Sequence, residues 1–258
     1  MPAGLPGLAT CEALWLQRNY LSALPEDIGD LESLKQLCIY GNHLTFLPDS
    51  IGNLTSLESL AANDNKLGPD LPESLFGMVN LLQLDVSDNH LTSLPSRLGE
   101  LPKLKHLWCA RNQLTSLPDS LARMNTLESL HLHENKLAKL PDNVSGWSHM
   151  RVLTLSKNKL VSLPNTLRFV NALERLSLDH NIDLGNDLVQ QGMFFTELHN
   201  LAALSLDRFV YEACTPEAQR WVTANVADLK ILKTVMSKAK MKEALFGKQI
   251  KGGMKLGE

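Results

Sequence analysis

Three histidines are the residues of this sequence best suited to binding a metal ion. His131 and His133 alternate along a stretch that is expected to form a strand, and His106 belongs to the neighbouring turn of the chain. Three imidazoles within reach of one ion could hold zinc. Because carboxylates that would orient such ligands are not evident from the sequence, we favour the alternative interpretation, a polar binding face without a metal.

Motifs of known enzyme classes are missing from the sequence. It contains no G-x-x-x-x-G-K-[ST], no G-x-G-x-x-G after a strand, no G-x-S-x-G and no H-E-x-x-H. We therefore predict a non-catalytic protein that uses no cofactor.

The composition narrows the environment of the chain. Its 258 residues carry a formal net charge of -3, which does not favour nucleic-acid binding. There is no run of about 18 apolar residues that predicts a membrane span, and the first residues lack the pattern of a signal peptide. The scattered cysteines favour a reducing, cytoplasmic location. Of these, Cys11 and Cys109 occupy core positions, Cys38 is expected to face outward, and Cys214 follows the repeats.

An internal repeat organises most of the sequence. Eight phased copies of the pattern L-x-x-L-x-L-x-x-N-x-L-x-x-L-P follow one another at steps of 23 or 24 residues, which indicates a repeat fold. The asparagines of the copies are Asn19, Asn42, Asn65, Asn89, Asn112, Asn135, Asn158 and Asn181.

Each part of the repeat has a physical role. The L-x-L step has a period of two and predicts a strand with one buried face. Proline cannot donate a hydrogen bond to a strand ladder, which suits the return segment. The asparagine amide both donates and accepts, so we expect it to pair buried backbone groups in the turn. Because one coil cannot bury its own leucines, stability must come from stacked neighbours.

The segment after each asparagine follows the pattern L-P-x-x-[IL]-x-x-L, which is clearest in residues 24–31 and 47–54. This 23-residue unit resembles the intracellular Ras-group leucine-rich-repeat proteins, which include erbin, scribble, the Ras suppressor and plant intracellular relatives. The resemblance covers roughly residues 1–210. It implies an α/β leucine-rich-repeat solenoid, a horseshoe with a parallel sheet on its concave face. It also implies scaffolding in signalling complexes, often around a small GTPase or a phosphatase.

The two ends of the chain depart from the repeat. Residues 1–8 match the back half of a coil, and Phe209 replaces the asparagine after a last strand at 201–206. A short helix is expected within 187–198. We therefore assign residues 1–210 to the solenoid with partial end repeats, and residues 211–258 to a C-terminal helical cap and basic tail.

The cap is predicted from a helix start and an apolar stripe. Thr215 supplies a capping hydroxyl and Pro216 occupies the first helical position. We expect the helix to cover the open end of the core, with Trp221 packing on the last coil. The stripe at helical spacing comprises Val222, Val226, Leu229, Leu232 and Met236.

Residues 230–258 hold eight lysines and two acidic residues, which gives this tail a charge of +6. We favour a solvated tail. A helix that binds a partner such as calmodulin, and a contact with an anionic membrane or nucleic acid, remain alternatives.

The concave face carries the candidate partner-binding residues. Strand alternation turns the residues between buried leucines outward, so that each coil adds to one continuous, exposed strip. Tryptophan, tyrosine and arginine are the residue types that often anchor interfaces. We assign partner binding to Trp15, Tyr40, Asp64, Asp85, Asp88, Trp108, Arg111, His131 and His133, which we call the strip.

Two functions fit these features. The first is a cytoplasmic scaffold or adaptor that docks a protein partner on the concave face, in intracellular signalling, as a monomer or as a subunit of a hetero-complex. The second is a structural subunit of a large assembly, such as a ciliary or axonemal complex.

Overall fold

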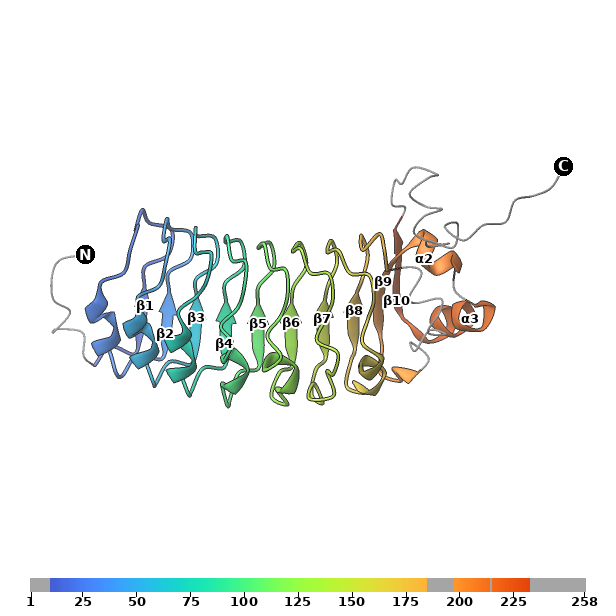
Figure 1. Cartoon of the computed structure of the whole chain (residues 1–258). Coiled ribbons are helices and arrows are strands. Elements are labelled where there is room, and N and C mark those ends of the chain that lie inside the picture. Colours follow the sequence, from blue (N-terminus) through green and yellow to red (C-terminus); the bar gives the residue numbers. More distant parts are fainter. Residues whose placement is uncertain (1–9, 185–196, 214, 233–258) are drawn as a thin grey trace.

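The computed structural model describes residues 10–184, 197–213 and 215–232. These residues form one parallel sheet whose strands lie in sequence order along an elongated molecule (Figure 1). The predicted leucine-rich-repeat solenoid is therefore confirmed. Its strands are β1 (Ala13–Trp15), β2 (Gln36–Cys38), β3 (Ser59–Ala61), β4 (Gln83–Asp85), β5 (His106–Trp108), β6 (Ser129–His131), β7 (Val152–Thr154), β8 (Arg175–Ser177), β9 (Ala203–Asp207) and β10 (Asp228–Leu232).

The register of the sheet aligns equivalent positions of successive repeats. The central leucines of neighbouring strands are partners, as in the pairs Leu37–Leu60 and Leu84–Leu107. These leucines are buried, whereas the residues on either side of them face out of the sheet. A constant register therefore builds one continuous leucine core from short strands, because each strand places its inward residue opposite the next.

The return segments form short 3-10 helices that begin after the repeat proline. Pro48, for example, is extended with φ of -66°, and the next residue starts η3. Glycine allows these helices to stack closely: a Cβ on Gly52 would lie 2.2 Å from the carbonyl oxygen of Ser74. The helices are η2 (Glu26–Asp30), η3 (Asp49–Asn53), η4 (Glu73–Gly77), η5 (Leu98–Glu100), η6 (Leu121–Arg123) and η7 (Asn165–Phe169).

The repeat asparagines from Asn42 to Asn181 are buried and form a ladder through the turns. The amide nitrogen of Asn112 donates to the carbonyls of Val86 (2.9 Å) and Ala110 (3.2 Å), and its oxygen accepts from the N–H of Leu91 (3.0 Å). Each asparagine thus joins two coils. The prediction that the asparagines pair buried backbone groups is confirmed for this ladder, whereas Asn19 in the first coil is exposed.

The C-terminal end adds α2 (Arg208–Ala213) and α3 (Pro216–Asn225) beside the last strands (Figure 1). The hydroxyl of Thr215 accepts the N–H of Ala218, as expected for a helix start. Val222 is fully buried, and Trp221 packs against the same core. The predicted start of the cap helix and its packing are therefore confirmed.

The predicted continuation of that helix is wrong. The helix ends at Asn225, and Leu229 lies in β10, which pairs with β9 in parallel register. The edge of the sheet explains the difference, because β9 offers unpaired backbone groups that a further strand can satisfy. The sheet therefore extends past residue 210, where the sequence suggested that the solenoid ends. Some of the sequence expectations lie outside the described residues. These concern Met236, residues 1–8, most of the basic tail and the expected helix at 187–198 apart from its last two residues.

The sequence expectations hold for three of the cysteines. Cys109 is fully buried, and burial raises the pKa of its thiol, while Cys11 is half-buried against the core. Cys38 lies on the outward side of β2 and is half-buried, which also raises its thiol pKa. Within the described ranges, no helix is long and apolar enough to cross a membrane.

Candidate interaction face

The structure places the nine strip residues on successive coils from β1 to β6, on the outward side of the sheet or in the turn after each strand. Trp15 is 58% exposed, and Asp64 and Arg111 are also exposed. The other six residues are only half-buried rather than fully exposed. The expectation of a freely exposed strip is therefore wrong for these six residues, because their side chains pack against side chains of the neighbouring coils.

The centre of the strip is a stack of aromatic rings. Trp108 on β5 is the register partner of His131 on β6, and their rings lie parallel at 10° with centroids 5.9 Å apart. His106, two residues before Trp108 on the same strand, adds a third ring at 5.6 Å. Burial, and then the neighbouring histidines and Arg175, lowers the pKa of His131 to about 4. His131 is therefore neutral at physiological pH.

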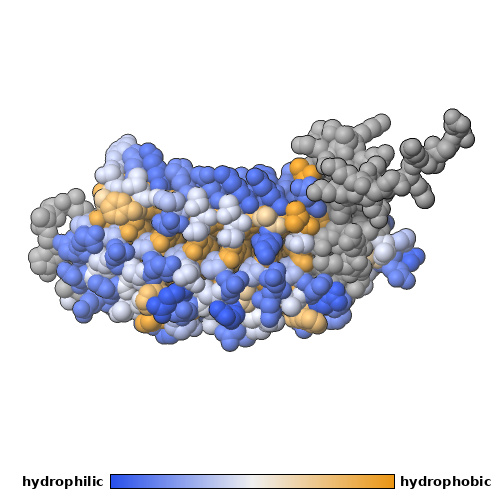
Figure 2. All heavy atoms as spheres, viewed as in Figure 1, coloured by the Kyte–Doolittle hydropathy of each residue, from blue (hydrophilic) through white to orange (hydrophobic). Residues whose placement is uncertain are grey.

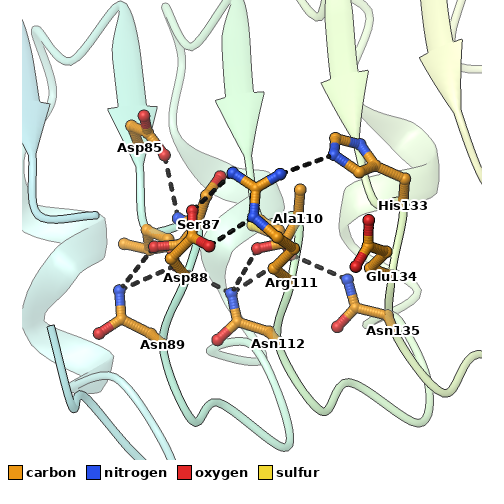
Figure 3. A network of polar contacts seen from close by, with 12 residues as sticks. Asp85, Ser87, Asp88, Asn89, Ala110, Arg111, Asn112, His133, Glu134 and Asn135 are labelled. Atoms are coloured by element: carbon orange, nitrogen blue, oxygen red, sulfur yellow. Dashed lines mark hydrogen bonds and ion pairs between the residues drawn. The ribbon is translucent and has the colours of Figure 1, made fainter. Parts of the chain in front are cut away.

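A polar network lies beside this stack, at the ends of β4 to β6 (Figure 3). The guanidinium of Arg111 donates to both carboxylate oxygens of Asp88, one of them at 2.6 Å. Its third nitrogen lies 3.3 Å from Nε2 of His133. Burial and the nearby Arg111 lower the pKa of His133, which favours the neutral form of the ring, the form that can accept this bond. The arginine is thus held in one orientation across three coils.

Asp85 lies at the end of β4, next to this network. One of its oxygens accepts the backbone N–H of Ser87 at 2.9 Å (Figure 3). Burial raises the pKa of Asp85, although hydrogen bonds from Ser87 oppose the shift.

The three histidines do not converge on a metal site. The Nδ1 atom of His106 contacts the hydroxyl of Ser129 at 2.9 Å, and those of His131 and His133 contact Thr154 at 3.4 and 3.1 Å. Among the residues that the structure describes, no group of three histidine, cysteine or acidic side chains is placed to hold a metal ion. The three rings instead contact hydroxyls of neighbouring coils.

Sequence reasoning missed the backbone conformation at one edge of the strip. The residue before each ladder asparagine has a positive φ, a conformation that favours glycine, asparagine and aspartate. Gly41 occupies this position in one coil, which is the sequence signal that alignment of the repeats could have used. The other coils place there Arg18, Asp64, Asp88, Arg111, Glu134, Lys157 and His180, with φ between 51° and 60°.

Ion pairs between coils follow both edges of the strip. At the edge with positive φ, Lys157 binds Glu134 at 2.9 Å. At the start of the strands, Lys35 binds Glu12 at 3.0 Å and Lys105 binds Glu128 at 2.8 Å. Exposed pairs of this kind contribute little to stability, typically about 0–1 kcal/mol. Their clearer effect is to neutralise charges along the margins, which leaves a few unpaired charges to determine the electrostatics of the face.

The surface around the described coils is largely polar. Figure 2 shows a narrow apolar band that runs along the molecule between largely polar margins, with a few apolar residues outside it. One hollow of about 480 Å³ lies beside α3, lined by residues that include Tyr211, Pro216 and Arg220. Another of about 470 Å³ is lined by Leu82, Lys105 and neighbouring residues at the start of the strands. Neither hollow is lined by residues of the strip.

Family models match three parts of the chain. Models described as leucine-rich repeats match residues 33–54, 79–123 and 125–182. No curated relative matches the chain. The segments 79–123 and 125–182 include the coils that carry the aromatic stack and the polar network.

Solved structures share the fold. A leucine-rich-repeat protein of Leptospira interrogans is 27% identical over 88% of this chain and 56% of its own, with a TM-score of 0.69. YopM from Yersinia enterocolitica is 29% identical over 65% of this chain and 33% of its own, with a TM-score of 0.51. A TDR receptor structure, 24% identical over 82% of this chain and 37% of its own, has a TM-score of 0.61.

The chain therefore spans between a third and just over half of the length of these structures. Leucine-rich-repeat domains generally mediate protein–protein interaction and are typically non-catalytic. The repeats, the asparagine ladder, the family models and the solved structures agree that this chain is a leucine-rich-repeat protein.

Proposed function

We propose that this protein is a non-catalytic scaffold or adaptor that docks a protein partner on the strip. The observation that carries the proposal is the stack of Trp108 on His131 beside the fixed guanidinium of Arg111. The core is complete without these side chains, because the leucines on the inner side of the sheet form it. A large aromatic ring and an arginine on an outward face are residue types that dominate binding energy at interfaces.

The half-burial of the strip supports this role. Side chains that already pack against their neighbours lose less conformational entropy when a partner binds, which favours affinity. Trp108 is restrained by rings on two sides, and Arg111 by Asp88 and His133. The strip is thus more ordered before binding than a row of freely exposed side chains would be.

The proposal extends to the cellular setting. The Ras-group resemblance suggests an intracellular, cytoplasmic signalling complex with a small GTPase or a phosphatase as partner. It also suggests a monomer or a subunit of a hetero-complex. The scattered cysteines support a reducing compartment, and the net charge of -3 does not favour a nucleic-acid partner.

A single substitution tests the docking site. The partner is first captured from the native source and then titrated against purified variants by calorimetry. Replacing Trp108 with alanine should weaken its binding tenfold or more, since the loss of an interface anchor often costs about 2 kcal/mol. Because Trp108 is half-buried and stacked, the same change should lower stability by only about 1 kcal/mol.

The matched control is Asp49→Ala on η3, at an exposed carboxylate in the return segment. It should leave both binding and stability unchanged. If Asp49→Ala abolishes binding while Trp108→Ala has no effect, the partner docks elsewhere and the proposal fails.

A further inference from the structure

Ion pairs cancel most of the charges at the centre of the strip, and two carboxylates remain. Asp88 is neutralised by Arg111, and Glu134 by Lys157. Asp64 is exposed after β3, and Asp85 is half-buried at the end of β4. Neither has a cation bound to it among the described residues. The β3–β4 end of the face is therefore negative.

The other end of the same face carries an unpaired cation. Arg175 begins β8, is exposed and has no carboxylate bound to it in the described part of the chain. Glu174, directly before Arg175, pairs with Arg151 at 3.4 Å. Asp179, in the turn after the strand, is buried and accepts hydrogen bonds from the hydroxyls of Ser156 and Ser205 and from His180. Arg175 is therefore a locally unpaired cation at the start of β8.

Two further cations on the described part of the face, Lys230 and Arg18, lie outside the span from β3 to β8. Lys230 occupies an outward position on β10, together with the exposed carboxylate of Asp228. Arg18 lies in the first coil, two coils from Asp64, and its guanidinium is 5.9 Å from the ring centre of Tyr40. It therefore bounds the negative region on its outer side. The unpaired charges between β3 and β8 are thus the carboxylates of Asp64 and Asp85 on one side and the guanidinium of Arg175 on the other.

The separation of these charges sets a length. Asp85 on β4 and Arg175 on β8 are four strand spacings apart, which corresponds to roughly 19 Å. An extended chain covers that distance in about six residues. Trp108 on β5 and His131 on β6 lie between the two charges.

We propose that the strip binds an extended segment of the partner that runs along the solenoid axis with a fixed order of charges. A lysine or arginine of the segment lies over Asp64 and Asp85, an apolar or aromatic residue packs on the Trp108–His131 stack, and a carboxylate about six residues from the cation meets Arg175. This inference rests on the proposed function, because it describes the partner that the same face would take. Charge complementarity decides which of the two directions the segment adopts.

Selection from a random peptide library tests the charge order. A phage-displayed library of random decapeptides is selected on the immobilised full-length chain, and enriched peptides are synthesised and titrated by calorimetry. We expect enriched peptides to carry a cation and an acid about six positions apart, in one order, with an apolar residue between them. Asp64→Asn combined with Asp85→Asn, and Arg175→Gln alone, should each weaken their binding about tenfold.

A charge exchange makes the test directional. In a chain with Asp64→Lys and Arg175→Glu, peptides with the opposite charge order should be enriched. Lysine can replace Asp64, since Lys157 has a similar positive φ at the same position of its own coil. The matched control exchanges the same charges away from the sheet face, by Asp49→Lys and Lys159→Glu, and should leave the original charge order in place.

The outcomes separate this inference from the proposed function. Failure to enrich any peptide, or enrichment without a charge order, overturns the inference. If such peptides still lose binding in Trp108→Ala, the strip remains the docking face and only the charge order is wrong. If their binding is unaffected by Trp108→Ala, both the inference and the proposed docking site fall.

Discussion

The asparagine ladder and the strip arise from the same turns, yet they behave in opposite ways. Asn65 and Asn63 lie two residues apart in one coil. Asn65 is buried: its amide nitrogen donates to the carbonyls of Ile39, Ala62 and Asn63, and its oxygen accepts the N–H of Leu44. Asn63 is half-buried at the position that the strip residues Tyr40 and His133 occupy in other coils. One position is the same from Asn42 to Asn181, while the other changes from coil to coil.

The difference shows where the fold leaves freedom for function. A ladder residue must satisfy backbone groups of two coils, so only a side chain that both donates and accepts fits there. A strip residue contacts mainly other side chains across the sheet, so its type can vary without opening the core. The strip can therefore carry binding residues at a small cost in stability.

The largest expected loss of stability comes from a substitution in the asparagine ladder that leaves the strip unchanged. Replacing Asn65 with leucine leaves several buried backbone groups unpaired and should lower the free energy of unfolding by about 3 kcal/mol. The same substitution at Asn63 should change it by less than about 0.5 kcal/mol, as is usual for surface positions. Urea denaturation of both variants measures the difference.

Equal losses in the two variants would show that the strip position is as structural as the ladder position. The contrast between the two regions would then be unfounded.

The pH dependence of the free energy of unfolding tests whether His131 is packed against its neighbours in the folded chain. In the folded chain the pKa of His131 is lowered to about 4, below the value of 6.5 expected when it is unfolded. The unfolded chain therefore takes up a proton first, and the stability that His131 contributes in its neutral form is lost as the pH falls from about 6.5 to about 4. Denaturation curves at pH 7 and pH 4.5 should show a larger loss for the wild type than for His131→Gln.

If the two proteins lose the same stability over this range, His131 is solvated as freely as the sequence first suggested. Its stack with Trp108 would then be too loose to order the strip before binding.

The smallest effect concerns the strained edge of the strip. Lys157→Asn and Lys157→Ala both remove the ion pair with Glu134. Only asparagine tolerates the positive φ of 55° well, so the asparagine variant should be more stable than the alanine variant by about 1 kcal/mol. Thermal melts of the two variants side by side give the comparison, and a more stable alanine variant would contradict the strain.

Much of the candidate site followed from alternation alone. Leu107 and Cys109 on either side of Trp108 had to face inward, as did the leucines on either side of His131, so Trp108 and His131 had to face outward, as they do. Their stacking could not be predicted with the same ease, because it depends on the register between coils and on ring orientation. The hydrogen bond from Arg111 to Asp88 likewise depends on the positive φ of both residues. The one sequence signal for this conformation is Gly41, which occupies the same repeat position in its own coil.

The sequence by itself determined the coils, because the period of 23 or 24 residues repeats the same local pattern and each asparagine marks a turn. The tertiary structure alone decided the end of the solenoid. Val222, Val226 and Leu229 keep a helical spacing, yet the chain leaves the helix after Asn225 and Leu229 enters β10. The exposed edge of β9 outweighs the local preference, because unpaired backbone groups at a sheet edge gain a full row of hydrogen bonds from one more strand.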